Sequence, residues 1–294
     1  AVGLSEWKQH LAAQTPEWAY THTTIKPERI VETARYIAGF KPASVVYPGR
    51  RTTWYGDDAQ RERAKAMLNA LLGAWGRKGG FYYPSRLEVP KFSYTKYPSP
   101  ERPPADMPKG SSYPLADEVL AQGLCDATVP GTADYDIKGW FVYGTNLVKS
   151  LPDAARVHKA IQELDFIVSV DVLPAEICGW SDVVLPESTY LERCDDVHAP
   201  GYRVPYLAIR QPVVQPMHDS RPGWWIAQQL GRRIGLDDYF PWEDAVDYAE
   251  QRVKAAGYDC EQLRKTGVVT GENQAAFEEE GLELTFDTPS GKIE

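Results

Sequence analysis

The feature that most constrains the fold is a strand–helix–strand pattern between residues 139 and 187. The apolar run GWFVYG is followed by the helical pattern SLPDAARVHKAIQELD and then by two more apolar runs, FIVSVD and SDVVLPE. Short apolar runs separated by one helix predict a βαβ unit, which closes right-handed on a parallel sheet. The sequence therefore predicts an α/β fold, with a mostly parallel sheet flanked by helices.

Further elements are expected on both sides of this unit. Residues 26–38 carry apolar side chains at helical spacing, a short apolar run at 43–47 predicts another strand, and a helical pattern follows from about residue 57 to 72. The remaining expected elements are an irregular strand pair at 202–214, helices at 222–234 and 242–256, and a hairpin at 282–294.

These patterns divide the chain into three parts. We expect a helical lead-in at 1–40, the α/β lobe at 41–235, and a helical tail with a truncated hairpin at 236–294. The lobe is interrupted at 84–114 by a stretch with eight prolines. Because proline donates no backbone hydrogen bond, this stretch predicts a long extended surface insertion, which is usually functional or partner-facing.

Composition excludes several classes of protein. With 294 residues, 43% of them hydrophobic and 25% charged, the chain has the composition of a globular protein. The net charge of −9 and the lack of a long basic run argue against nucleic acid as the main partner. The apolar runs are far shorter than the roughly 20 residues of a spanning helix. The first residues lack Met and a signal-peptide pattern, which indicates a mature form or a piece of a longer protein.

Neither cysteine nor histidine spacing predicts a metal site. The four cysteines form no CxxC motif and match no zinc or cluster pattern, and the five histidines are scattered. We expect four structural thiols, with a Cys178–Cys194 disulfide as the alternative in an oxidising compartment. GxGxxG, GxxxxGK[ST], HExxH and GxSxG motifs are also missing from the sequence.

Three loops that follow predicted strands carry polar side chains. The first is Tyr47-Pro48-Gly49-Arg50-Arg51, the second is Gly144-Thr145-Asn146, and the third begins at Val170-Asp171. In parallel α/β sheets ligands bind beyond the carboxyl ends of the strands. Arginines there suit a phosphate or another oxyanion, and an Asp or Asn suits a ribose or a base edge. Solvated arginines, an ordinary turn and a helix-capping Asp are the alternative interpretations of these loops.

Taken together, these loops resemble a known family. The run DFIVSVDVLPAEICGWSDVVLPESTYLER is similar to a segment of the catalytic subunits of the dimethyl sulfoxide reductase family of molybdopterin oxidoreductases. The matching features are Asp171 at the end of a strand, the motif at 181–186 and Glu192. Further similar segments are PGRRTTWYGDDAQRERAKAMLNALLGAWGRKGG, FVYGTNLVKSLPD and TPSGKIE. Within the family, the chain looks most like the polysulfide, thiosulfate and tetrathionate reductase branch.

The resemblance implies a Rossmann-like nucleotide-binding lobe that holds a molybdenum bis(molybdopterin guanine dinucleotide) cofactor, and it assigns residues to this cofactor. Asn146 would contact a pterin-linked nucleotide, Val170 and Asp171 would hold its guanosine end, and Arg193 would be a basic cofactor contact. Tyr47 and Arg51 would contact the cofactor near the metal, and Arg50 or Arg51 would face an anionic sulfur substrate as catalytic residues. No residue of this chain is expected to ligate the metal.

The resemblance also implies a larger enzyme. The chain would be an internal portion of the catalytic subunit, inactive by itself, without the N-terminal part that carries a [4Fe-4S] cluster and without the C-terminal domain. Expected partners are a ferredoxin-like iron–sulfur subunit, a membrane anchor subunit and the remaining domains of the same subunit. The enzyme would reduce a small inorganic anion in anaerobic respiration on the periplasmic or outward-facing side of the membrane. The alternatives are a cofactor-free structural or assembly relative, or an arsenate- or selenate-type reductase.

Overall fold

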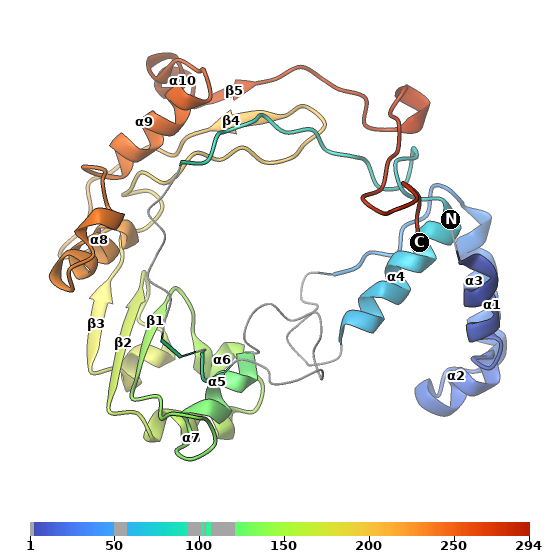
Figure 1. The fold of residues 1–294 in the computed structure, drawn as a ribbon, viewed down its shortest axis with the longest axis horizontal. Coiled ribbons are helices and arrows are strands. Elements are labelled where there is room, and N and C mark those ends of the chain that lie inside the picture. The colour runs from blue at the N-terminus through green and yellow to red at the C-terminus, as the bar shows by residue number, and fades with distance from the viewer. Residues whose placement is uncertain (1–2, 50–57, 93–100, 103, 107–120) are drawn as a thin grey trace.

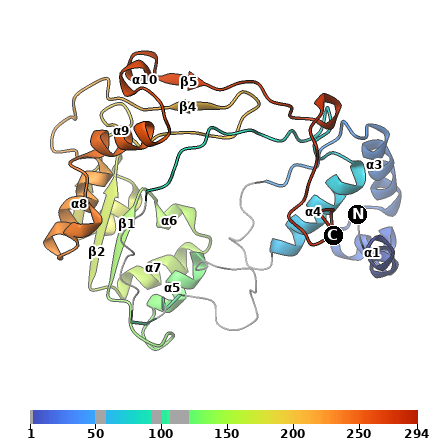
Figure 2. The ribbon, with the colours of Figure 1, turned by 45° about the horizontal axis from the view of Figure 1, so that its top comes forward.

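The structure, a computed structural model, describes residues 3–49, 58–92, 101–102, 104–106 and 121–294. The described elements lie along a wide arc, with the two chain ends near each other (Figures 1 and 2). One end of the arc holds four helices, and the other end holds the parallel sheet. The four helices are α1 (Leu4–Leu11), α2 (Pro16–Thr23), α3 (Pro27–Gly39) and α4 (Asp58–Leu72).

The predicted parallel sheet and its flanking helices are confirmed. Strands β1 (Gly139–Tyr143), β2 (Phe166–Asp171) and β3 (Val183–Pro186) pair in the order β1-β2-β3, and both pairings are parallel. The β1–β2 crossover contains α6 (Leu147–Ser150) and α7 (Ala154–Gln162), and the β2–β3 crossover contains the short helix η2 (Glu176–Trp180). The register pairs Tyr143 with Val170 and Asp171 with Pro186, so the strands end at one common edge.

One face of this sheet forms the first hydrophobic core. Side chains alternate along β1, so that Trp140 and Val142 are buried while Phe141 and Tyr143 are exposed. The buried face packs against α7 and against α5 (Ala121–Thr128). The first core consists of Cys125, Trp140, Val142, Leu151, Val157, Ala160, Ile161, Ile167 and Ile177. The indole nitrogen of Trp140 donates to the Thr128 hydroxyl at 3.1 Å, so its one polar atom is satisfied inside the core.

A second core forms around a two-stranded sheet. Strands β4 (Tyr206–Ala208) and β5 (Val268–Thr270) pair antiparallel, and the helices between them in the sequence are α8 (Gly223–Arg233), η3 (Asp237–Tyr239), α9 (Ala245–Ala255) and α10 (Cys260–Thr266). Its buried side chains are Leu207, Val253 and Leu263. Leu87 and Val89 of the Pro-rich stretch pack against them, so this part of the insertion is extended and joins the core.

The expected strand pair at 202–214 is wrong, because its strand β4 pairs with β5, about 60 residues further along the chain. The hairpin expected at 282–294 is also wrong, since those residues form turns and irregular backbone. A last short helix, η4 (Glu278–Glu280), precedes them.

The strand expected at 43–47 is wrong as well. These residues run beside α4 without joining the sheet. The side chain of Asn69, only 1% exposed, accepts from the amide of Val46 at 2.8 Å and donates to its carbonyl at 2.8 Å. One buried side-chain amide thus satisfies backbone groups that a neighbouring strand would otherwise satisfy.

The early and late parts of the chain interlock beyond α4. Trp75 and Phe81 stack with ring centroids 4.8 Å apart, and the Tyr83 amide donates to the carbonyl of Ala276 at 3.0 Å. Nε of Arg77 donates to Oε1 of Glu279 at 2.7 Å. Segment 75–83 is therefore held by residues that lie about 200 positions later in the sequence.

The chain exposes an unusually large surface. Its accessible surface is 19838 Å², whereas a compact monomer of this mass exposes about 12,500 Å². Helices α1 to α3 contain no buried residue, and Phe141 in the sheet is 54% exposed. Such extended apolar exposure is typical of surfaces that pack against other polypeptide. Among the described helices, none has the length and apolar character needed to cross a bilayer.

Candidate functional site

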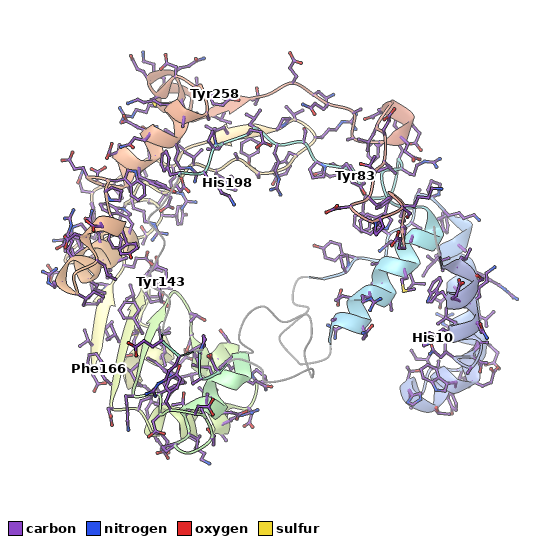
Figure 3. The ribbon with its side chains drawn as sticks, viewed as in Figure 1. His10, Tyr83, Tyr143, Phe166, His198 and Tyr258 are labelled. Carbon is purple, nitrogen blue, oxygen red and sulfur yellow. The ribbon has the colours of Figure 1, made fainter. Side chains whose placement is uncertain are left out.

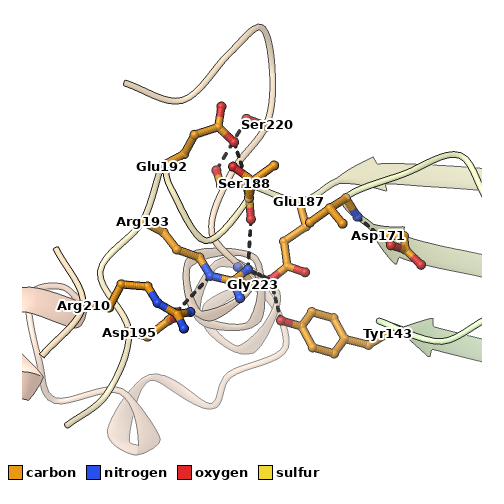
Figure 4. A network of polar contacts seen from close by, with 12 residues as sticks. Tyr143, Asp171, Glu187, Ser188, Glu192, Arg193, Asp195, Arg210, Ser220 and Gly223 are labelled. Carbon is orange, nitrogen blue, oxygen red and sulfur yellow. Dashed lines mark hydrogen bonds and ion pairs between the residues drawn. The ribbon is translucent and has the colours of Figure 1, made fainter. Parts of the chain in front are cut away.

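The three parallel strands bring three polar side chains to one edge. Tyr143 ends β1, Asp171 ends β2 and Glu187 directly follows β3 (Figure 4). The Glu187 amide donates to the Asp171 carbonyl at 3.0 Å, and the Gly144 amide donates to the Val170 carbonyl at 2.9 Å. Figure 3 shows Tyr143 at the end of the sheet opposite to Phe166, which begins β2. This carboxyl edge is where α/β folds bind ligands.

Asn146 lies at this edge with one amide atom fixed and the other without a partner. Its Nδ2 donates to Oε2 of Glu176, and Lys149 pairs with the same carboxylate at 3.4 Å. The pKa of Glu176 is lowered by its backbone hydrogen bond, and also by Asn146 and Lys149. Oδ1 of Asn146 is buried and has no hydrogen-bond partner among the described residues. A buried acceptor without a partner is costly, and it is satisfied when a ligand brings a donor.

Asp171 and Val170 lie next to this loop, and they differ in burial and in the contacts of their side chains. Oδ1 of Asp171 accepts from the amides of Val172 at 2.7 Å and Leu173 at 3.4 Å, which orders the start of the next loop. Oδ2 has no hydrogen-bond partner in the described part of the chain and is left for a donor. Val170 is 1% exposed and its carbonyl accepts from the Gly144 amide, so it supports the edge from inside the sheet.

The side chain of Glu187 connects three segments of this edge. Its Oε1 accepts from the Tyr143 hydroxyl at 2.5 Å, from Nη1 of Arg193 at 2.6 Å and from the Gly223 amide at 3.2 Å. We call these four residues the Glu187 junction (Figure 4). Burial of the hydroxyl, together with the neighbouring Glu187 carboxylate, raises the pKa of Tyr143 to about 12, so the phenol keeps its proton and donates.

Arg193 extends the junction into a longer ionic chain. Its Nε donates to Oδ1 of Asp195 at 2.9 Å, and its Nη1 donates to the Ser188 carbonyl at 2.9 Å. Asp195 also pairs with Arg210. The guanidinium of Arg193, whose side chain is 20% exposed, is thus held between two carboxylates. These contacts fix its position at the edge, and its role towards a cofactor stays a prediction.

A cavity of about 460 Å³ opens beside the junction. Tyr143, Glu187, Arg193 and Gly223 line one side of it, and the rest is lined by Asp195, Asp196, residues of α8 and residues between 239 and 248. Its aromatic members are Tyr143, Trp224, Tyr239, Phe240, Trp242 and Tyr248. The cavity has the size of a small-molecule site, and the described carboxyl edge forms part of its wall.

Glu192 closes the loop that follows β3. It is 7% exposed, and its two oxygens accept from the amides of Thr189 and Met217, each at 2.7 Å. These backbone hydrogen bonds lower the pKa of Glu192 below its usual 4.5, because they favour the charged form. Glu192, which matched the family motif in the sequence, therefore stabilises the loop through buried hydrogen bonds to its backbone.

The lowered pKa of Glu192 predicts a dependence of stability on pH. A depressed folded-state pKa gives stability that is present above the unfolded value of 4.5 and is lost as the pH falls through the folded value. The melting temperature of the Glu192→Gln variant should therefore lie furthest below that of the parent near about pH 6, and the difference should shrink towards about pH 3.5. Thermal unfolding of both proteins across this range is the measurement. A difference that stays constant with pH would contradict the prediction.

Of the remaining predicted site residues, the structure describes only Tyr47. Tyr47 is 77% exposed and follows Val46, whose amide donates to Asn69 of α4 and not to a strand of the parallel sheet. Arg50 and Arg51 lie outside the described residues. The structure therefore brings Asn146, Val170, Asp171 and Arg193 together, and it leaves Tyr47 apart from them.

The sequence reasoning missed Tyr143, Glu187 and Gly223. Glu187 directly follows a predicted strand, which is the same signal that singled out Asp171. The Tyr143 hydroxyl and the Gly223 amide carry no such signal, because their role depends on contacts across 44 and 36 positions of the sequence.

Comparison with known proteins decides the family. The family model described as "Molybdopterin oxidoreductase" matches residues 60–233, which is more than half of the chain. The chain belongs to the molybdopterin oxidoreductase family. The matched range contains the parallel sheet, the junction and α8. The expected relationship and the α/β fold are therefore both confirmed.

Two relatives align with almost the whole of this chain. The thiosulfate reductase molybdopterin-containing subunit PhsA of Salmonella typhimurium is 29% identical over 99% of this chain and 43% of its own length. The probable dimethyl sulfoxide reductase chain YnfF of Escherichia coli is 26% identical over 96% of this chain and 38% of its own length. The chain thus spans less than half the length of these relatives.

A solved structure supports the fold. Acetylene hydratase from Pelobacter acetylenicus superposes with a TM-score of 0.65 at 19% identity, over 99% of this chain and 43% of that protein. At this identity the likeness concerns the path of the backbone alone.

Proposed function

We propose that this chain is part of the catalytic subunit of a molybdenum bis(molybdopterin guanine dinucleotide) oxidoreductase, in which it binds and orients the cofactor. The observation that carries the proposal is the carboxyl edge of the sheet, within the range matched by the family model. There the buried Oδ1 of Asn146 and the Oδ2 of Asp171 have no hydrogen-bond partner among the described residues. The buried Oδ1 of Asn146 needs a donor, which a ligand would supply, and the Oδ2 of the half-buried Asp171 can accept another.

The residues at this edge fit a guanine dinucleotide. A guanine base offers N–H donors and a ribose offers hydroxyl donors, which suit a carboxylate and an amide oxygen. Asp171 and Asn146 would hold this end of the cofactor, and the backbone at Val170 would line it. When bound, the molybdenum and its dithiolene ligands supply two-electron redox chemistry, while the protein binds and orients the group. Arg50 and Arg51 remain the proposed substrate-facing residues, outside the described part of the chain.

Reduction of an inorganic sulfur compound is the proposed reaction. It is supported by the relative named as a thiosulfate reductase subunit, which aligns with 99% of this chain. Polysulfide, thiosulfate and tetrathionate are the proposed substrates. A second candidate is an arsenate-type reduction, because the arsenate respiratory reductase subunit ArrA of Shewanella sp. is 25% identical over 74% of this chain. Turnover assays of the complete enzyme with each oxyanion and with polysulfide separate these candidates.

The proposed setting follows from the same family. The electrons would arrive through a [4Fe-4S] cluster and a ferredoxin-like subunit, and a membrane anchor would hold the complex on the periplasmic or outward-facing side. Co-purification of these subunits with the complete protein tests the partners. Fractionation of the source cells tests the location.

Replacing Asp171 by alanine should lower the cofactor content of the complete enzyme. A hydrogen bond to a charged group contributes about 1.5–3 kcal/mol, so its loss weakens binding by roughly 10- to 100-fold. We expect the molybdenum content per polypeptide, measured by elemental mass spectrometry, to fall accordingly. The matched control is Asp165→Ala, since Asp165 precedes the same strand at its other end and is 72% exposed.

The outcomes separate the proposal from its alternative. Full molybdenum content in Asp171→Ala would contradict the assignment of the guanosine site. A complete parent protein that contains no molybdenum would favour a cofactor-free structural or assembly relative.

A further inference from the structure

One carboxylate oxygen joins the segments that meet at the carboxyl edge. Oε1 of Glu187 receives the Tyr143 hydroxyl from β1, the Arg193 guanidinium from the loop after β3 and the Gly223 amide from the start of α8. The Glu187 side chain is only 7% exposed. A buried carboxylate is costly unless it is paired and hydrogen-bonded. These donors therefore determine where the carboxylate lies, and the carboxylate determines where the three segments lie.

The backbone of Glu187 connects the junction to the proposed cofactor site. The Glu187 amide donates to the carbonyl of Asp171 at 3.0 Å. Tyr143, which donates to the side chain, lies three residues before Asn146 on the β1 loop. A shift of Glu187 is thus transmitted to both residues that offer unpartnered oxygen atoms.

The junction leaves no room for a side chain at position 223. A Cβ atom on Gly223 would lie 2.2 Å from the Tyr143 hydroxyl oxygen and 2.6 Å from Oε1 of Glu187. Only a residue without Cβ lets the start of α8 approach the carboxylate this closely. The three segments are therefore closely fitted at this point.

We propose that Glu187 is a positioning residue that sets the carboxyl edge of the sheet and thereby holds Asn146 and Asp171 in the arrangement that binds the cofactor. The carboxylate acts through its charge on Arg193 and through its acceptor oxygen on Tyr143 and Gly223. The effect on the cofactor rests on the function proposed above. The effect on the three segments does not depend on that function.

Hydrogen exchange followed by mass spectrometry tests this role in the complete protein. In Glu187→Ala, amide exchange should accelerate by roughly tenfold or more in residues 144–147, 188–193 and 223–226 together, because each segment loses its contact with the carboxylate. In Glu187→Gln, the amide oxygen still accepts from Tyr143 and Gly223, but the ion pair with Arg193 is lost. Exchange should then accelerate in residues 188–193 alone.

A matched control is Glu261→Ala. Glu261 also forms an ion pair, with Lys265 at 2.7 Å, but its side chain is 78% exposed. An exposed pair contributes little to stability, so exchange in the three segments should stay at the parent rate.

The two variants also test the alternative that Glu187 only fills space between the segments. If Glu187 only filled space, glutamine would restore all three segments equally, and this result would overturn the proposal. Unchanged exchange at 144–147 and 223–226 in Glu187→Ala would overturn it as well.

The molybdenum content of the same variants tests the link to the cofactor separately. Accelerated exchange in Glu187→Ala with a several-fold lower molybdenum content supports the whole proposal. Accelerated exchange with full molybdenum content overturns the link between Glu187 and the cofactor site, while the effect on the three segments and the proposed function both stand. A parent protein without molybdenum counts against the proposed function instead.

Discussion

Replacing Gly223 by alanine is expected to destabilise the protein by about 2 kcal/mol, because overpacking a closely fitted site typically costs about 1–3 kcal/mol. The added Cβ would meet the Tyr143 hydroxyl oxygen at 2.2 Å, Oε1 of Glu187 at 2.6 Å and Cε2 of Tyr143 at 2.8 Å. Either the tyrosine or the start of α8 must move. Denaturation in urea, followed by tryptophan fluorescence, measures the loss.

Two further variants show whether the close approach is the cause. Gly179→Ala is the matched control, since a Cβ on Gly179 would meet nothing within 4 Å. Adding Tyr143→Phe to Gly223→Ala removes the nearest atom, so it should recover part of the stability. A Gly223→Ala variant as stable as the Gly179→Ala variant would contradict the prediction.

Truncating Ile177 to alanine is expected to cost about 3–4 kcal/mol, since replacing a buried Ile by Ala typically costs about 2–5 kcal/mol. Ile177 is fully buried in the first core, where the β2–β3 crossover packs under the sheet. The remaining side chains are fixed by the parallel strands and by α7, so they can fill the space only in part. Chemical denaturation of the complete protein measures the loss.

Leu263→Ala is the comparison, because Leu263 is fully buried in the second core. Hydrogen exchange should accelerate in β1, β2 and α7 for Ile177→Ala, and in β4, β5 and α9 for Leu263→Ala. Equal acceleration of both regions in either variant would show that the two cores unfold as one unit, contrary to the prediction.

The elements that the sequence predicted best are those with a local pattern. The period of the apolar side chains predicted β1, α7 and β2 correctly, because burial on one face of a strand or helix requires apolar residues at a regular spacing in the sequence. The apolar run at 43–47 has the same composition as a strand, yet Asn69 satisfies its backbone. A side chain 23 positions away cannot be found from the run itself.

The candidate site was predictable only in part, for a similar reason. Asp171 and Asn146 follow strands, and parallel pairing brings the ends of strands together. The internal ion pairs of Arg193 depend on Glu187 and Asp195, and the junction also needs the missing Cβ at Gly223. Such contacts arise from packing between segments that are distant in the sequence, so residue spacing does not predict them. The domain boundaries and the cofactor contacts stay predictions.

The interlocking of the early and late segments has a consequence for how the chain folds during synthesis. Arg77 meets Glu279, a partner 202 positions later. At about 5–20 residues per second, the ribosome needs roughly 10–40 s to reach that partner. Throughout this interval, segment 75–83 lacks its contacts with Ala276 and Glu279, whereas β1, β2 and β3 are complete within a span of 48 residues, Gly139–Pro186. The parallel sheet should therefore form first on the ribosome, and the segment after α4 is the region for which a nascent chain most needs a chaperone.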